Sequence, residues 1–117
     1  MTTDPECIFC KIVGGQIAAD IVLRDAQVTA FRDTNPQMPT HVLVVPNSHI
    51  ANTEALESAH DATVGAVVRA ARSVASQEGL SERGYRLVFN TGPDASNSVA
   101  HLHMHVLGGR QMKWPPG

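Results

Sequence analysis

Hydrophobic residues recur with helical spacing between residues 58 and 79. The apolar positions are Val64, Val67, Val68, Ala71, Val74 and Ala75. Side chains three or four residues apart share one face of a helix, so the pattern predicts a long amphipathic helix with one side in a core. Ser58 and Asp61 are suitable N-terminal capping groups, and Gly79 is a suitable stop.

Shorter apolar runs predict the strands of a sheet. Residues 21–24 and 28–32 are β-prone and separated by three turn-forming residues, which predicts a hairpin. Residues 41–46 contain four consecutive apolar residues between turn signals, typical of a strand buried on both faces. Residues 85–90 and 101–107 predict two more strands, and strands around one long helix indicate an α+β fold with an antiparallel sheet.

The remaining segments predict a short helix, loops and a tail. Residues 7–13 form an apolar stretch ended by two glycines, which is compatible with a brief N-terminal helix. Residues 91–98 form a long polar connection of the kind that often carries function. The ending 114–117 contains two prolines and cannot continue a helix or a central strand. With no repeat or linker to divide the chain, we expect a single domain over residues 1–117.

Composition narrows the class of protein. The chain has 117 residues, of which 43% are hydrophobic and 17% charged, as in globular proteins. Its formal charge of -2 argues against a broad basic face for long nucleic acid. No apolar run approaches the roughly 18 residues of a membrane span, and the start of the chain lacks the regions of a signal peptide. We therefore expect a cytoplasmic protein with no membrane partner.

Three histidines alternate with apolar residues near the end of the chain, at His101, His103 and His105. On a strand, alternate side chains share one face, so these imidazoles would form a row. A neutral imidazole held through one nitrogen is a competent nucleophile at the other. A metal-binding strip and an ordinary polar strand face are the alternatives, but three alternating histidines between a polar loop and two glycines favour a functional site.

This segment matches the HxHxHxx motif of the histidine triad (HIT) family. The ending, residues 109–117, is similar to that of the family's Hint branch. The likeness extends over almost the whole chain and includes residues 30–33, 36–41 and 98–99. The resemblance implies a HIT-like fold, a homodimer, and binding of a purine nucleotide with an AMP or GMP moiety.

The resemblance also implies roles for individual residues. The middle histidine of the triad, here His103, forms a nucleotidyl-histidine intermediate. His41, on the preceding strand, supports this nucleophile, and His105 lies against the phosphate. Taken alone, His41 beside two prolines would carry no functional meaning.

Further matching positions belong to nucleotide binding. Asp33 corresponds to the acid that binds the ribose, while Asn90 and Ser98 correspond to polar groups near the ribose, the phosphate and the leaving group. Trp114 belongs to a tail that packs near the partner's active site in the family, and we expect it to influence leaving-group preference. By themselves Asp33, Asn90 and Ser98 are ordinary turn and loop residues.

The resemblance and the chemistry together predict a nucleotidyl hydrolase that cleaves purine nucleoside 5'-phosphoramidates, such as AMP linked to an amine or aminoacyl group. A covalent histidine divides one difficult displacement into two easier ones. Neither a glycine-lysine phosphate loop nor a cluster of magnesium-binding carboxylates is present in the sequence, so we expect no catalytic metal. The alternatives are a dinucleoside polyphosphate hydrolase and a nucleotide-binding, zinc-stabilised adaptor. A nucleotidyl transferase fits less well, since His105 stands where that branch has glutamine.

The only two cysteines, Cys7 and Cys10, form a CxxC pair. In a reducing compartment such a pair suggests metal or redox chemistry more than a structural disulfide. Two thiolates and two imidazoles complete a tetrahedral zinc site, and His49 and His101 are the candidate nitrogen ligands. The alternative is two small, partly buried thiols on a short helix.

Overall fold

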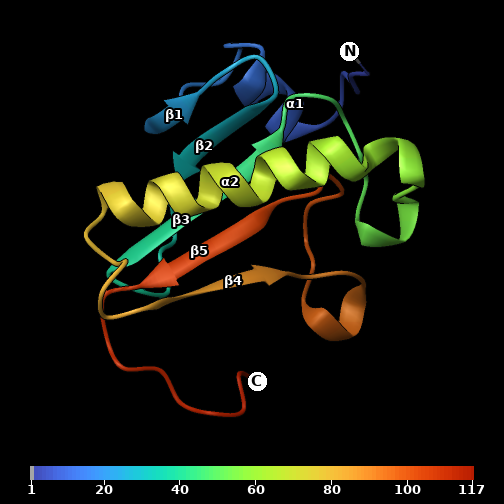
Figure 1. Cartoon of the computed structure of the whole chain (residues 1–117). Coiled ribbons are helices and arrows are strands. Elements are labelled where there is room, and N and C mark those ends of the chain that lie inside the picture. Colours follow the sequence, from blue (N-terminus) through green and yellow to red (C-terminus); the bar gives the residue numbers. More distant parts are fainter. Residues whose placement is uncertain (1) are drawn as a thin grey trace.

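A five-stranded antiparallel sheet forms the centre of the structure (Figure 1), a computed structural model that describes residues 2–117. The strands are β1 (Ile21–Arg24), β2 (Val28–Arg32), β3 (Thr40–Pro46), β4 (Tyr85–Phe89) and β5 (Met104–Gly108). Their order across the sheet is β1-β2-β3-β5-β4, and every neighbouring pair is antiparallel. The predicted α+β class and the hairpin of the first two strands are confirmed.

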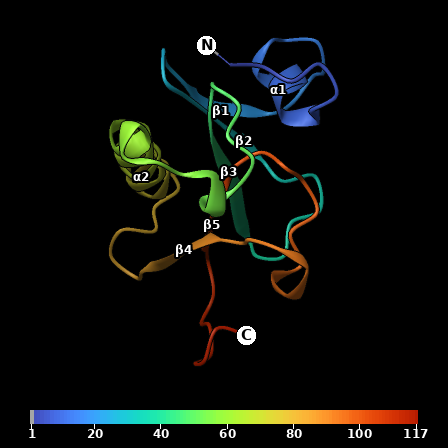
Figure 2. The same cartoon turned by 90° about the vertical axis from the view of Figure 1, so that its right-hand side faces the viewer.

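Helices lie on both sides of this sheet. The long helix α2 (Asp61–Gln77) covers one face, and the short helix α1 (Ile8–Val13) lies on the opposite side (Figure 2). Three short 3-10 helices, η1 (Thr53–Ala55), η2 (Ser58–His60) and η3 (Pro93–Ala95), occur in the connections. No helix of residues 2–117 has the length and apolar character needed to cross a membrane.

The ends of α2 differ in part from the prediction. Ser58 begins the 3-10 turn η2 and does not cap α2; Glu57 and His60 form a capping box around that turn instead. A 3-10 turn at the entry lets the first amides find partners before the regular helix starts. Gly79 follows the helix with φ +74°, a conformation that glycine adopts without a steric cost, so the predicted stop is confirmed.

Alternation along β3 separates the core into two parts. Val42 and Val44 pack against the apolar face of α2, together with Met104 and Val106 of β5. Leu43 and Val45 point to the other side of the sheet, where they pack against α1. The side chains that β3 and β5 do not direct toward α2 are therefore available for a site on the opposite face.

The last strand begins later than predicted. The sequence predicts a strand over residues 101–107, whereas β5 starts at Met104. Continuing the β3–β5 register would place Leu102 opposite Pro46, which has no amide hydrogen to donate. Leu102 N–H instead donates to the carbonyl of Ile50 at 2.6 Å. His101 and His103 consequently lie before the strand, and only His105 lies within it.

The buried face of α2 provides a test of the core. Val74 is fully buried, whereas Val68 on the same helix is 40% exposed. We expect Val74→Ala to lower the free energy of unfolding by about 2 kcal/mol, because it leaves a cavity. Val68→Ala should change it by less than about 0.5 kcal/mol. Urea denaturation measures both values, and equal effects would contradict the assigned burial.

Candidate active site

Histidine side chains gather in two neighbouring clusters near the sheet face opposite α2. His41, His103 and His105 form the first, which we call the triad cluster. His49 and His101 form the second together with the two cysteines, and we call it the thiol cluster. His101, the first histidine of the motif, packs against Phe9 as His103 does, but its ring belongs to the thiol cluster.

His103 is held through one ring nitrogen. Its Nδ1 lies 2.6 Å from the main-chain oxygen of His101. A carbonyl oxygen can only accept, so Nδ1 carries the hydrogen and the lone pair of the neutral ring is on Nε2. The ring of Phe9 packs edge-on against it with centroids 5.1 Å apart, and the ring of His105 lies at 5.1 Å on the other side. This arrangement fixes the ring and leaves Nε2 as its nucleophilic atom.

His41 and His105 contact each other across β3 and β5. The Nε2 atom of His41 lies 2.8 Å from Nδ1 of His105, a hydrogen-bond distance. The carboxylate of Asp33 lies 3.4 Å from the same Nε2 atom. His41, expected to support the nucleophile, thus makes its hydrogen bond to His105, the neighbour of His103.

Burial keeps these two rings neutral. Desolvation, together with the nearby His103 and His41, lowers the pKa of His105 to about 4. Desolvation also lowers the pKa of His41, although the charge of Asp33 acts in the opposite direction. At neutral pH each ring therefore offers one N–H group and one lone pair.

The structure brings two of the predicted binding residues to the triad cluster. Asp33 directly follows β2 and lies beside His41. Asn90 directly follows β4, and its side-chain nitrogen lies 3.4 Å from His105 Nε2. Both positions are at strand ends, where a side chain can reach into the space above the sheet.

The other two predicted binding residues lie further out. Ser98 is exposed and lines a surface pocket of about 270 Å³ with Asp4 and Cys7. Trp114 is 83% exposed in the tail that follows β5, and the tail runs away from the sheet (Figure 1). An indole with that much apolar surface in water is a natural contact for another molecule.

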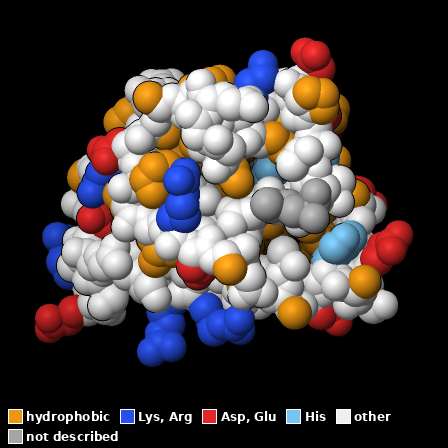
Figure 3. Space-filling view, turned by 90° about the horizontal axis from the view of Figure 1, so that it is seen from above, with side chains coloured by type: hydrophobic (Ala, Val, Ile, Leu, Met, Phe, Trp, Pro, Cys, Tyr) orange, Lys and Arg blue, Asp and Glu red, His pale blue; other side chains and the backbone are white. Residues whose placement is uncertain are grey.

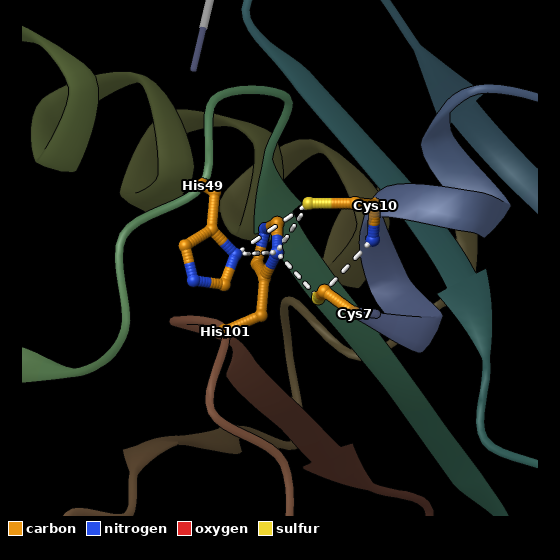
Figure 4. Close-up of side chains that lie close together, drawn as sticks. All are labelled: Cys7, Cys10, His49 and His101. Carbon is orange, nitrogen blue, oxygen red and sulfur yellow. Dashed lines mark hydrogen bonds between the residues drawn. The ribbon is translucent and has the colours of Figure 1, made fainter. Parts of the chain in front are cut away.

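The thiol cluster brings Cys7, Cys10, His49 and His101 together, as Figure 4 shows. His101 Nδ1 lies 3.3 Å from Cys7 Sγ, 3.5 Å from Cys10 Sγ and 3.3 Å from His49 Nδ1. Cys10 Sγ also lies 3.5 Å from His49 Nδ1. Four potential ligand atoms from three separate segments thus converge on one point.

These distances fit a tetrahedral zinc ion. Zinc–sulfur and zinc–nitrogen bonds of about 2.3 and 2.0 Å require neighbouring ligand atoms to lie roughly 3.3 to 3.8 Å apart. His101 Nε2–H donates to the carbonyl of Pro46 at 2.9 Å, which turns the Nδ1 lone pair toward the sulfurs. A ligand ring held through its other nitrogen is the usual arrangement around a bound metal. Burial lowers the pKa of His101 to about 4 and raises that of the Cys10 thiol.

A second set of ligand-type atoms belongs to Asp33, His41 and His105. Two imidazoles and a carboxylate could hold a divalent cation in principle. Here, however, the two rings are hydrogen-bonded directly to each other.

Two further residues, Phe9 and Gln37, contact the histidines of the site and are not among the residues predicted from the sequence. Phe9 stands between the two cysteines and packs edge-on against both His101 and His103, with ring centroids 5.9 and 5.1 Å apart. The main-chain N–H of Gln37 donates to His41 Nδ1 at 3.0 Å. The sequence C-I-F-C could have suggested a packing role for the aromatic residue, but nothing in the residue type of Gln37 points to a main-chain contact.

The family of the chain follows from comparison with known proteins. The model of the HIT domain family matches residues 14–112. The chain belongs to this family, which confirms the resemblance read from the histidine motif. The match includes the triad cluster and all five strands of the sheet.

Individual relatives narrow the class to hydrolases. The purine nucleoside phosphoramidase of Escherichia coli is 45% identical over 107 residues, 92% of this chain and 90% of that protein. A 14 kDa zinc-binding protein of Zea mays is 47% identical over 116 residues, 97% of this chain and 90% of that protein. The crystal structure of a HIT family hydrolase from Legionella pneumophila superposes with a TM-score of 0.94 at 46% identity, covering 96% of this chain and all of that one.

The low pKa of His105 makes stability depend on pH. The ordinary histidine pKa is 6.5, and in the folded protein it is about 4, so between these values the unfolded chain binds more protons. The free energy of unfolding should therefore be highest above pH 6.5 and fall as the pH drops toward 4. Urea titrations across this range should give a shallower pH dependence for His105→Asn. An equally steep curve would contradict the burial of a neutral ring.

Proposed function

We propose that the chain hydrolyses purine nucleoside 5'-phosphoramidates, such as AMP linked to an amine or an aminoacyl group, through a nucleotidyl intermediate on His103. The observation that carries this proposal is the hydrogen bond from His103 Nδ1 to the carbonyl of His101. It leaves the Nε2 lone pair for attack and prevents the ring from turning. The name of the phosphoramidase relative supports this choice of substrate.

The reaction proceeds in two displacements at the α-phosphorus. In the first, His103 Nε2 forms a bond to phosphorus, the phosphorus–nitrogen bond of the substrate breaks, and the amine leaves with a proton supplied within the site. In the second, water attacks phosphorus and the bond to Nε2 breaks. One proton of the water returns to the donor group, and AMP leaves. His105, beside the nucleophile, donates to a phosphoryl oxygen as charge builds on it.

The substrate contacts follow from the strand ends around the triad cluster. Asp33 binds the ribose hydroxyls, and Asn90 lies between the ribose and phosphate positions. Ser98, on the loop before the triad, donates to the phosphate or to the leaving group. His41 acts through His105, to which it is hydrogen-bonded.

We also infer that the chain forms a homodimer. Strand β4 lies at the edge of the sheet, and an open edge is a template for pairing with another strand. A second copy on that side would bring its tail, including the exposed Trp114, toward the neighbouring site. Long nucleic acid does not fit, because acidic and basic side chains are interspersed on the face in Figure 3 and the formal charge is -2.

Cys7, Cys10, His49 and His101 are proposed to hold a structural zinc ion. Their spacing supports this assignment, and so does the name of the zinc-binding relative. When bound, the ion would tie α1 to the segments after β3 and before β5, and so contribute to folding rather than turnover. Thiolate ligands persist in a reducing compartment, so we place the protein in the cytoplasm.

Replacing the nucleophile tests the proposed reaction. His103→Ala should lower the turnover of an adenosine phosphoramidate by several orders of magnitude, because no other atom takes the place of Nε2. AMP should still bind, as calorimetry can measure. His60→Ala is the matched control, since this histidine lies in η2, outside both clusters, and should turn over substrate like the wild type.

Three results would contradict this reaction. They are full activity of His103→Ala, an equal loss in the control, and turnover of a dinucleoside polyphosphate alone. The proposed reaction needs no divalent ion at the phosphate, so turnover that stops when magnesium is removed would count against it as well.

Zinc binding is tested by metal analysis of protein purified without chelators. We expect about one zinc ion per chain, because the four ligand atoms form a complete tetrahedral set. His49→Ala and Cys10→Ser should lose the metal and melt at a lower temperature, while His60→Ala should keep the metal. Wild-type protein free of zinc would exclude the assignment.

A further inference from the structure

The loop between β2 and β3 places a main-chain amide against the triad cluster. Gln37 N–H donates to His41 Nδ1 at 3.0 Å. The loop is held in place locally, since Asp33 Oδ1 accepts from Asn35 N–H at 2.8 Å and the Gln37 side chain donates to the Asn35 carbonyl at 3.0 Å. The amide therefore reaches the ring from a braced turn.

This contact determines which nitrogen of His41 carries the hydrogen. A main-chain N–H can only donate, so His41 Nδ1 must offer its lone pair. The ring is 6% exposed, and burial favours its neutral form. A neutral imidazole has one N–H group, which must then be on Nε2. A proton on Nδ1 would bring two N–H groups against each other.

The position of the hydrogen on His41 also determines the tautomer of His105. His41 Nε2–H points at His105 Nδ1, 2.8 Å away, so that nitrogen accepts and the hydrogen of the neutral His105 ring is on Nε2. The carboxylate of Asp33, 3.4 Å from His41 Nε2, favours a hydrogen at that position as well. The amide of Asn90 next to His105 Nε2 must then present its oxygen, because two N–H groups cannot bond to each other.

We propose that the main-chain amide of Gln37 is a positioning group that fixes the tautomers of His41 and His105, so that His105 presents an N–H group beside the lone pair of His103. The Nε2 atoms of His103 and His105 then have opposite functions, one as a nucleophile and the other as a hydrogen-bond donor. His103 Nε2 attacks phosphorus, and His105 Nε2–H donates to a phosphoryl oxygen. The tautomers depend on the hydrogen bonds alone, whereas their kinetic effect rests on the proposed function.

The same hydrogen-bond chain affects metal binding by Asp33, His41 and His105. A cation on His41 Nε2 would displace the hydrogen to Nδ1, where it would meet the Gln37 N–H group. The amide thus maintains these three residues as a hydrogen-bond chain and disfavours a metal site among them.

Nitrogen NMR of the wild-type protein reads the tautomers directly, because protonated and unprotonated ring nitrogens have well-separated 15N shifts. We expect Nε2 protonated and Nδ1 unprotonated in both His41 and His105, and the reverse pattern in His103. A hydrogen on Nδ1 of His41 or of His105 would overturn the proposal without any mutation.

A pair of variants isolates the amide. Gln37→Pro removes the N–H group, whereas Gln37→Ala removes the side chain and keeps it. The alanine variant should retain the wild-type tautomers, and the proline variant should show a measurable fraction of His41 with hydrogen on Nδ1, since only Asp33 then favours hydrogen on Nε2. Turnover of the proline variant should be about 10- to 100-fold below that of the alanine variant, mainly in kcat, in proportion to a lost proton-donating contact.

The outcomes separate this proposal from the proposed function. Unchanged tautomers in a folded Gln37→Pro protein, or altered ones in Gln37→Ala, would refute the role of the amide. If the proline variant does not fold, the wild-type spectrum still decides. Expected tautomers in a protein that does not cleave phosphoramidates would uphold the inference and refute the proposed reaction instead.

Discussion

The hydrogen bond between His103 and the carbonyl two residues earlier is the contact on which the proposed chemistry depends. It fixes which nitrogen of the ring is free, and it lies in residues 101–103, just before β5 begins. The missing amide hydrogen of Pro46, which would lie opposite Leu102 if the register continued, is a reason that the strand does not extend through these residues.

One face of the sheet packs against α2, and the other face carries the histidines of the candidate site. On one face Val42, Val44 and Met104 bury apolar surface against α2, which stabilises the strands. On the other face the alternate positions of the same strands, His41 and His105, provide polar groups. Any shift of register by one residue would exchange the two sets, so the apolar packing under α2 maintains the geometry of the imidazoles.

The thiol cluster and the triad cluster are connected through His101 and Phe9. His101 contributes its ring to the thiol cluster and its carbonyl to His103, while Phe9 packs on both rings. Zinc bound by the thiol cluster would thus hold the segment that orients His103, the proposed nucleophile. This gives a physical reason for cysteines on α1, far along the chain from the reacting atom.

Much of this arrangement could be predicted from the sequence. Periodicity predicts α2, the hairpin of β1 and β2, and the buried β3, because each is a regular pattern of apolar positions. The CxxC pair and His49 with His101 are also grouped correctly in space. The late start of β5 could not be predicted, since it depends on which residue, Pro46, lies opposite in a register that only the folded sheet defines.

Contacts of the main chain could not be predicted for a similar reason. The amide of Gln37 acts through a group that every residue except proline possesses. The resemblance implies that His41 supports His103, whereas its hydrogen bond is to His105, which the register of β3 and β5 places within reach. The contact of Ser98 with the phosphate or the leaving group stays a prediction. The influence of Trp114 on leaving-group preference also stays a prediction, because its contacts would come from a second chain.

The central claim concerns one covalent bond, and trapping that bond tests it most directly. The protein would be mixed rapidly with an adenosine phosphoramidate, quenched at alkaline pH, where a phosphorus–histidine bond survives, and digested for mass spectrometry. The account predicts an adenylyl group on His103. An adduct on His105, or release of the amine in the first turnover with no adduct on any histidine, would contradict it.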